Sequence, residues 1–65
     1  MFFQLKTEMD KNGISIEAMA QTIGKSPDWL EEALTGKIEM PTEVAALIKE
    51  KFFPGATFDY LFYED

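Results

Sequence analysis

The hydrophobic residues of the chain recur at helical spacing in short blocks, which glycine, proline and cap residues separate. No block shows the sustained alternation of apolar and polar residues that a half-buried strand requires. The pattern therefore predicts an all-α fold, a compact bundle of four helices plus a short fifth. The expected helices span residues 2–11, 16–22, 27 to 34 or 35, 41 or 42 up to the break at Pro54-Gly55, and 58–62.

Residues typical of helix ends flank these blocks. Gly24 follows the second block and is expected to adopt a left-handed conformation that ends the helix. Hydroxyl side chains suited to accept a hydrogen bond from a helix N-terminus belong to Ser15, Ser26 and Thr57. Further stop signals are Asn12-Gly13 and Gly36.

The apolar side chains on one side of each helix are expected to form the core. These are Phe2, Phe3, Leu5, Met9, Met19, Ala20, Ile23, Leu30, Ala33, Val44, Leu47, Ile48 and Phe52. The C-terminal aromatics are expected to be mostly buried as well, because a small bundle needs large side chains to bury enough area. They are Phe52, Phe53, Phe58, Tyr60, Phe62 and Tyr63, of which the last two could instead serve self-association.

Length and composition bound the function. At 65 residues the chain is expected to be one domain, 1–65. Histidine, cysteine and arginine are absent, which removes disulfides, thiolate ligands and the usual general base. The chain is too small to build a catalytic cleft around Glu31 and Glu32. We therefore expect no enzyme, no metal and no cofactor. No apolar run approaches a membrane span, and residues 1–5 do not resemble a signal peptide, so the expected compartment is the cytoplasm.

Residues 16–35 read as one unit, in which two short helices flank a turn containing Gly24. Small Ala20 suits a close crossing of two helix backbones, and the spacing is that of a helix-turn-helix. The stretch resembles the lambda-repressor/Cro-like (Xre) family through Ile14-Ser15, Met19-Ala20, Ile23-Gly24, Ser26, Leu30 and Gly36-Lys37. The tail FPGATFDYLF also resembles small phage-type regulators of this superfamily. The resemblance implies a helix-turn-helix bundle and a role in transcription regulation.

A second likeness covers EAMAQTIGKSPDWLEEALTGKIEMP, which is similar to the N-terminal helical domain of cyanate lyases. The shared features are Trp29, the pair Ala33-Leu34, Gly36 and Pro41. In those enzymes this domain serves subunit assembly, and the catalytic part is a separate domain that this chain does not contain. The likeness therefore implies an oligomerisation module and does not imply cyanate chemistry.

The positions that read DNA in the repressor family carry unsuitable residues in this chain. They correspond to Ile16, Glu17, Pro27, Asp28, Glu31 and Glu32. A reading helix presents chiefly Arg, Lys, Asn or Gln to base edges, and none of these positions has one. From Asp28 to Glu43 there are five acids and one lysine, a local charge of −4, and the whole chain carries −6. Such a surface repels phosphate backbones.

The same surface suits a basic protein partner. We favour the hypothesis that the chain is an antirepressor or modulator, from a phage or mobile element, which binds a DNA-binding repressor and competes with its operator. The expected partner-binding residues are Ile16, Glu17, Asp28, Trp29, Glu31, Glu32 and Thr35. Trp29 serves either as an anchor for the partner or as a residue at the core boundary. The acids are either a binding face or merely solvated.

Three further questions stay open. The chain could read an operator directly, as Cro-like proteins do, in which case Lys6, Lys25 and Lys37 are the expected phosphate contacts. It could also be an oligomerisation module. Whether it forms a homodimer does not follow from its sequence, and no membrane partner is expected.

Overall fold

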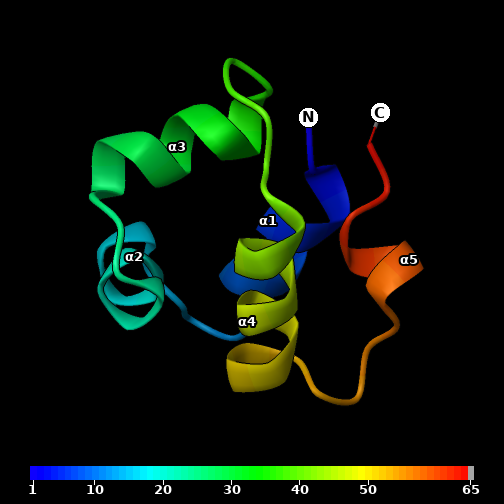
Figure 1. Cartoon of the computed structure of the whole chain (residues 1–65). Coiled ribbons are helices and arrows are strands. Elements are labelled where there is room, and N and C mark those ends of the chain that lie inside the picture. Colours follow the sequence, from blue (N-terminus) through cyan, green and yellow to red (C-terminus); the bar gives the residue numbers. More distant parts are fainter. Residues whose placement is uncertain (65) are drawn as a thin grey trace.

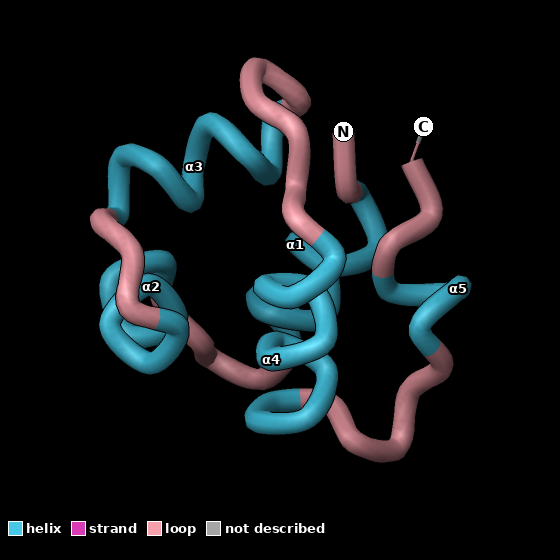
Figure 2. Tube along the Cα trace, in the orientation of Figure 1, coloured by secondary structure: helices cyan, strands magenta, loops and turns pink. Residues whose placement is uncertain are grey.

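Five helices make up the regular structure of the computed structural model, which describes residues 1–64 (Figure 1). They are α1 (Phe3–Lys11), α2 (Ile16–Ile23), α3 (Pro27–Thr35), α4 (Thr42–Phe52) and α5 (Phe58–Leu61). Residues 1–64 contain no strand (Figure 2). The all-α prediction is confirmed. The predicted helices begin or end at most one residue from the observed ones, as where α1 starts at Phe3 instead of Phe2 and α5 ends at Leu61 instead of Phe62.

The predicted cap residues act as expected. The hydroxyl oxygens of Ser15, Ser26 and Thr57 accept hydrogen bonds from the third residue beyond them, at 3.0, 3.1 and 3.2 Å. Gly24 ends α2 with φ 75° and Gly36 ends α3 with φ 91°, both in the left-handed region where a side chain is disfavoured. These two glycines set the directions in which the chain enters and leaves α3.

One fully buried side chain from each helix meets in the core. Leu5, Met19, Leu30, Ile48 and Leu61 are the largest fully buried side chains, and they belong to α1, α2, α3, α4 and α5 in that order. Buried around them are Phe2, Met9, Ala20, Ile23, Ala33, Leu34, Val44, Ala45 and Phe53. The Cα radius of gyration is 10.4 Å, close to the roughly 11 Å expected for a folded chain of this length.

The contacts between helices form one connected series in which α4 joins α2 to α5. α2 packs against α3 and α4, and α5 packs against α1 and α4. The two ends of the chain lie side by side in Figure 1, and the Met1 amino nitrogen lies 4.0 Å from a Glu64 carboxylate oxygen. α3 therefore has one side against α2 and the core, and its outer side faces solvent.

Three contacts fasten the chain ends to the bundle. The Phe2 amide donates a hydrogen bond to the Leu34 carbonyl at 3.1 Å, which joins the N-terminal segment to the end of α3. The Phe2 ring meets the Phe62 ring edge to face at 5.8 Å. The Tyr60 hydroxyl donates a hydrogen bond of 3.0 Å to Glu8 Oε2, which ties α5 to α1.

The predicted burial of the aromatic residues is largely wrong. Of the six C-terminal aromatics only Phe53 is buried; Phe52 and Phe62 are half-buried, and Phe58, Tyr60 and Tyr63 are exposed. Phe3 is 56% exposed and Leu47 is 37% exposed, although both were expected in the core. The aliphatic residues of the five helices already fill the small interior, so most of these rings remain at the surface.

Removing the central side chain of α3 should unfold much of the protein. Leu30 is fully buried, and we expect Leu30→Ala to lower the free energy of unfolding by roughly 2–5 kcal/mol, because it leaves a cavity. Urea denaturation followed by circular dichroism measures the loss. Glu31→Ala, an exposed neighbour on the same helix, is the control, and an equal loss in both variants would contradict the central role of Leu30.

The bond between α5 and α1 should appear in the ionisation of Tyr60. The hydrogen bond to the Glu8 carboxylate, then desolvation and the Glu8 charge, raise the pKa of Tyr60 above its ordinary value of 10.0, and Lys11 opposes the shift. Because the pKa is higher in the folded state than in the unfolded state, protonation of Tyr60 stabilises the folded state relative to the unfolded state. The stabilisation is thus complete below the pKa of the unfolded state and is lost as pH rises through that of the folded state.

Ultraviolet titration of a Tyr63→Phe variant, in which Tyr60 is the remaining tyrosine, measures this pKa. Adding Glu8→Gln should lower it, because a neutral amide stabilises the protonated phenol less than a carboxylate does. An unchanged titration curve would show that the hydrogen bond does not form in solution.

Candidate functional site

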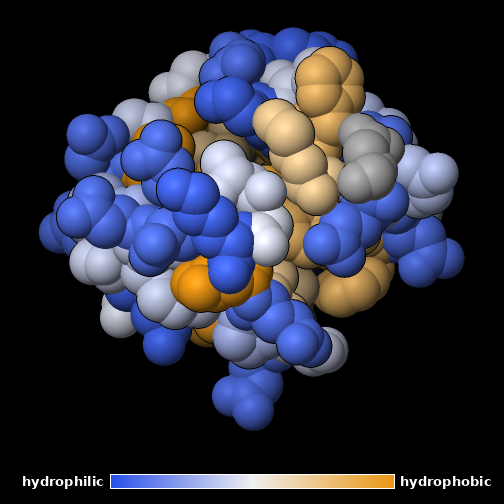
Figure 3. Space-filling model, turned by 90° about the horizontal axis from the view of Figure 1, so that it is seen from above, coloured by the Kyte–Doolittle hydropathy of each residue, from blue (hydrophilic) through white to orange (hydrophobic). Residues whose placement is uncertain are grey.

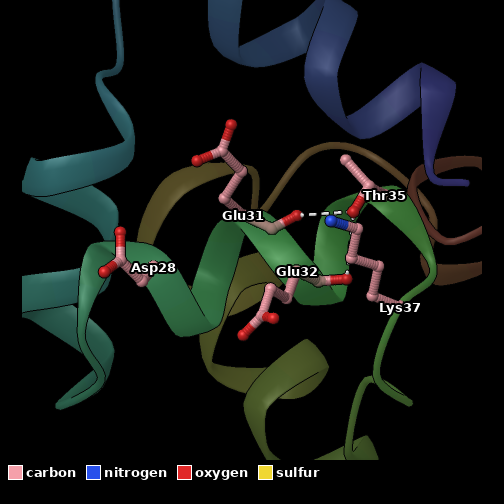
Figure 4. Close-up of a pocket in the computed structure, with 5 residues that line it drawn as sticks. All are labelled: Asp28, Glu31, Glu32, Thr35 and Lys37. Carbon is pink, nitrogen blue, oxygen red and sulfur yellow. Dashed lines mark hydrogen bonds between the residues drawn. The ribbon is translucent and has the colours of Figure 1, made fainter.

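The outer side of α3 carries a row of exposed polar side chains. Asp28, Glu31, Glu32 and Thr35 are all exposed, and with Lys37 they line a shallow hollow of about 490 Å³ (Figure 4). The spacing of three and four residues places them on adjacent turns of one helix side. Leu30, Ala33 and Leu34 hold the opposite side of α3 in the core. We call this surface the acidic face, defined by Asp28, Glu31, Glu32 and Thr35.

Backbone carbonyls of the acidic face accept hydrogen bonds, whereas its carboxylates form no ion pair within residues 1–64. The Thr35 hydroxyl donates to the carbonyls of Glu31 and Glu32 at 3.0 and 3.3 Å, and the Lys37 amide donates to the Glu32 carbonyl at 2.9 Å. Within residues 1–64, the ion pairs join Met1 to Glu64 and Lys11 to Glu8, and neither includes an acid of α3. The three carboxylates are therefore free to meet external cations.

The carboxylates spread around the outer side of α3. In Figure 4 the side chains of Asp28 and Glu31 point to one side of the helix, and that of Glu32 points to the other. Among residues 1–64 no group of three or more acidic side chains lies close enough to hold a metal ion. The arrangement presents a broad negative surface to a partner, without convergence on a single point.

Trp29 lies at the boundary of the core. It is half-buried and packs against the core cluster. The Lys25 ammonium nitrogen lies 5.0 Å from the centre of the indole ring, within range of a cation–π interaction. The interpretation of Trp29 as a boundary residue therefore describes its packing, whereas its contact with Lys25 was not predicted.

Three expected partner-binding residues do not line the hollow: Ile16, Glu17 and the boundary residue Trp29. Ile16 is half-buried and packs against the core, so it offers little surface to a partner. Glu17 is exposed in the first turn of α2 but does not line the hollow beside α3. Lys37, expected as a phosphate contact if the chain binds DNA, is exposed and lines that hollow.

The lysines expected to contact phosphates are spread over separate elements. Lys25 precedes α3 and Lys37 follows it, and Lys6 belongs to α1; all three are exposed. Between Lys25 and Lys37 lies α3, which has nine residues and is therefore about 14 Å long at 1.5 Å per residue. The stretch between them carries three acids and no lysine.

A second hollow was not predicted. It has a volume of about 240 Å³ and an apolar floor of Phe2, Met40, Ala45, Phe58 and Phe62, with Glu39, Thr42 and Glu64 around it. We call it the end groove, since it lies beside both ends of the chain. The sequence signal was the close spacing of Phe58 and Phe62, whose rings meet at 4.9 Å. Phe58 was expected in the core, and Phe62 either in the core or in a self-association surface.

No helix within residues 1–64 combines the length and hydrophobicity needed to cross a membrane. A scan against protein-family models found no match, and searches of curated proteins and of solved structures found none either.

The Lys25–Trp29 contact should contribute measurably to stability. We expect Lys25→Gln to lower the free energy of unfolding by about 0.5–1 kcal/mol, the size of an exposed cation–π interaction. Because Trp29 is the single tryptophan, its fluorescence reports both the contact and urea denaturation. Lys37→Gln removes the same charge from the other end of α3 without touching the ring, and it should leave the tryptophan emission unchanged.

Proposed function

We propose that the chain is a small transcription-regulatory protein that binds a basic protein partner through the acidic face. In this proposal α2 and α3 form a helix-turn-helix of the lambda-repressor/Cro-like kind. Support comes from the three-residue connection between Ile23 and Pro27, from the left-handed Gly24, and from the fully buried Ala20 where two helices pack closely.

The observation that carries the proposal is the chemistry of the outer side of α3. In a helix-turn-helix this side of the second helix enters the major groove and offers hydrogen bonds to base edges. Here it offers the three unpaired carboxylates of the acidic face. Each of them would approach DNA phosphates in a partly desolvated groove and would repel them.

The lysines do not compensate for this repulsion. Lys25 is engaged with the ring of Trp29, and Lys37 is a single cation at the far end of the hollow. A basic surface that itself binds DNA is the natural complement of the acidic face, because opposite potentials steer association. A DNA-binding repressor, whose operator-binding surface is basic, is therefore the partner we favour, and the chain would act as an antirepressor or modulator.

The deciding experiment mixes the purified chain with its cognate repressor and a labelled operator at physiological salt. We expect operator occupancy to fall as the chain is added, and a complex of chain and repressor to form without DNA. If occupancy stays constant, the antirepressor function is wrong. If the chain alone retards a specific operator, direct DNA binding replaces it.

Charge reversal on the acidic face should weaken the partner complex without unfolding the chain. Because both positions are exposed, Asp28→Lys and Glu32→Lys should leave the circular dichroism spectrum intact. Each should reduce affinity for the repressor by roughly tenfold, mainly through slower association. The matched control is Glu50→Lys, an exposed position near the end of α4, which changes net charge equally. Equal weakening in all three variants would show that only net charge matters.

A further inference from the structure

The end groove is an apolar depression formed by parts of the chain that are distant in sequence. Its floor combines the N-terminal segment, the α3–α4 connection, α4 and the C-terminal aromatics through Phe2, Met40, Ala45 and Phe62. The edge-to-face contact of Phe2 with Phe62 and the contact of Phe58 with Phe62 hold the aromatic wall in place. The groove is therefore formed by contacts between segments that meet only in the folded chain.

Several large hydrophobic side chains at the two ends of the chain are exposed. Phe58 is 39% exposed in the wall of the groove, and the exposed Met1, Phe3 and Tyr63 belong to the same two ends of the chain. Figure 3, which views the side where α3 and both ends lie, shows a band of hydrophobic side chains beside a largely hydrophilic surface. Exposed apolar surface rimmed by polar residues marks interaction sites.

The size of the groove limits what it can hold. Sites for small organic ligands have volumes of about 300–1,000 Å³ and enclose most of the ligand. The end groove has about 240 Å³ and is open to solvent along one side. It has room for one large apolar side chain that a partner presents from its own surface.

The carboxylates at the rim of the groove favour a partner with positive charge. Glu39 and Glu64 stand beside the apolar floor. The Met1 amino nitrogen lies 4.0 Å from Glu64, but both groups are more than half exposed, so this pair is weak. An apolar side chain that enters the groove brings its flanking residues close to these carboxylates, and lysine or arginine there gains attraction.

We propose that the end groove binds an apolar side chain flanked by lysine or arginine, presented by another protein. A second copy of this chain fits less well, because a net charge of −6 would bring acidic surfaces together around the groove. The connection between α3 and α4 contributes Lys37 to the hollow beside the acidic face, and it contributes Glu39 and Met40 to the end groove. The groove's specificity nevertheless stands without the acidic face.

The test uses three short peptides as probes of the whole chain, labelled with ¹⁵N for NMR. The first is Lys-Lys-Leu-Phe-Lys-Lys. The second, Lys-Lys-Ser-Gly-Lys-Lys, keeps the charge and lacks the apolar anchor, and the third, Glu-Glu-Leu-Phe-Glu-Glu, keeps the anchor and reverses the charge. We expect the first to shift the amide signals of Met40, Ala45 and Phe62 in a saturable way. The other two should bind at least about tenfold more weakly.

Two variants separate the roles of charge and shape. Glu39→Lys combined with Glu64→Lys should weaken binding of the first peptide at least fivefold more than Asp10→Lys combined with Glu50→Lys, which makes the same charge change at exposed positions outside the groove. Thr42→Trp should fill the groove and abolish binding without changing charge. Thr42 is exposed in the first turn of α4 and makes no cap hydrogen bond, so the fold should persist.

Several results would overturn the proposal. The first peptide could leave the groove signals unmoved, shift only the signals of α3, or bind no better than the peptide without the anchor. Concentration-dependent shifts of the same groove signals without any peptide, together with a dimer in analytical ultracentrifugation, would make a second copy the occupant. None of these outcomes bears on the repressor assay, so the two proposals can fail separately.

Discussion

The structure depends on the joint burial of one aliphatic or methionine side chain from every helix. Leu5, Met19, Leu30, Ile48 and Leu61 meet at the centre, and within residues 1–64 the buried set contains no polar or charged residue. Burying each such side chain contributes on the order of 1.5–3 kcal/mol, whereas helices of four to eleven residues have little stability alone. The interior thus holds the helices together, and any recognition chemistry has to lie on the surface.

The sequence predicted the helices well because their end signals are local. Ser26 caps α3 and Gly36 ends it through interactions within a few residues, which are legible without knowledge of the fold. The burial of aromatic residues depends instead on tertiary packing, which decides which rings face the small interior. Phe2 is buried and Phe3 is exposed, although the two are identical neighbours, because only Phe2 faces Phe62 and the core. A four-residue helix such as α5 also has too few turns to define an apolar side from its pattern.

The acidic face and the end groove likewise differ in how far the sequence predicts them. The acidic face follows from helical geometry, since the buried positions Leu30 and Leu34 assign the opposite positions to solvent. Its hollow also needs Lys37, which comes from the connection after α3 and has no helical rule to place it. The end groove requires residues from 2 to 64 to meet, and no local pattern in the sequence predicts such long-range contacts. The Lys25–Trp29 contact, although local, depends on side-chain conformation.

The proximity of the two chain ends has a practical consequence for protein engineering. Because Met1 and Glu64 lie within ion-pair distance, a few glycine residues would suffice to link them covalently. New termini could then be opened at the exposed Asn12-Gly13 turn between α1 and α2. Such a circular permutant would carry affinity tags and fluorophores at that turn instead of beside the end groove, leaving the groove unobstructed for binding measurements.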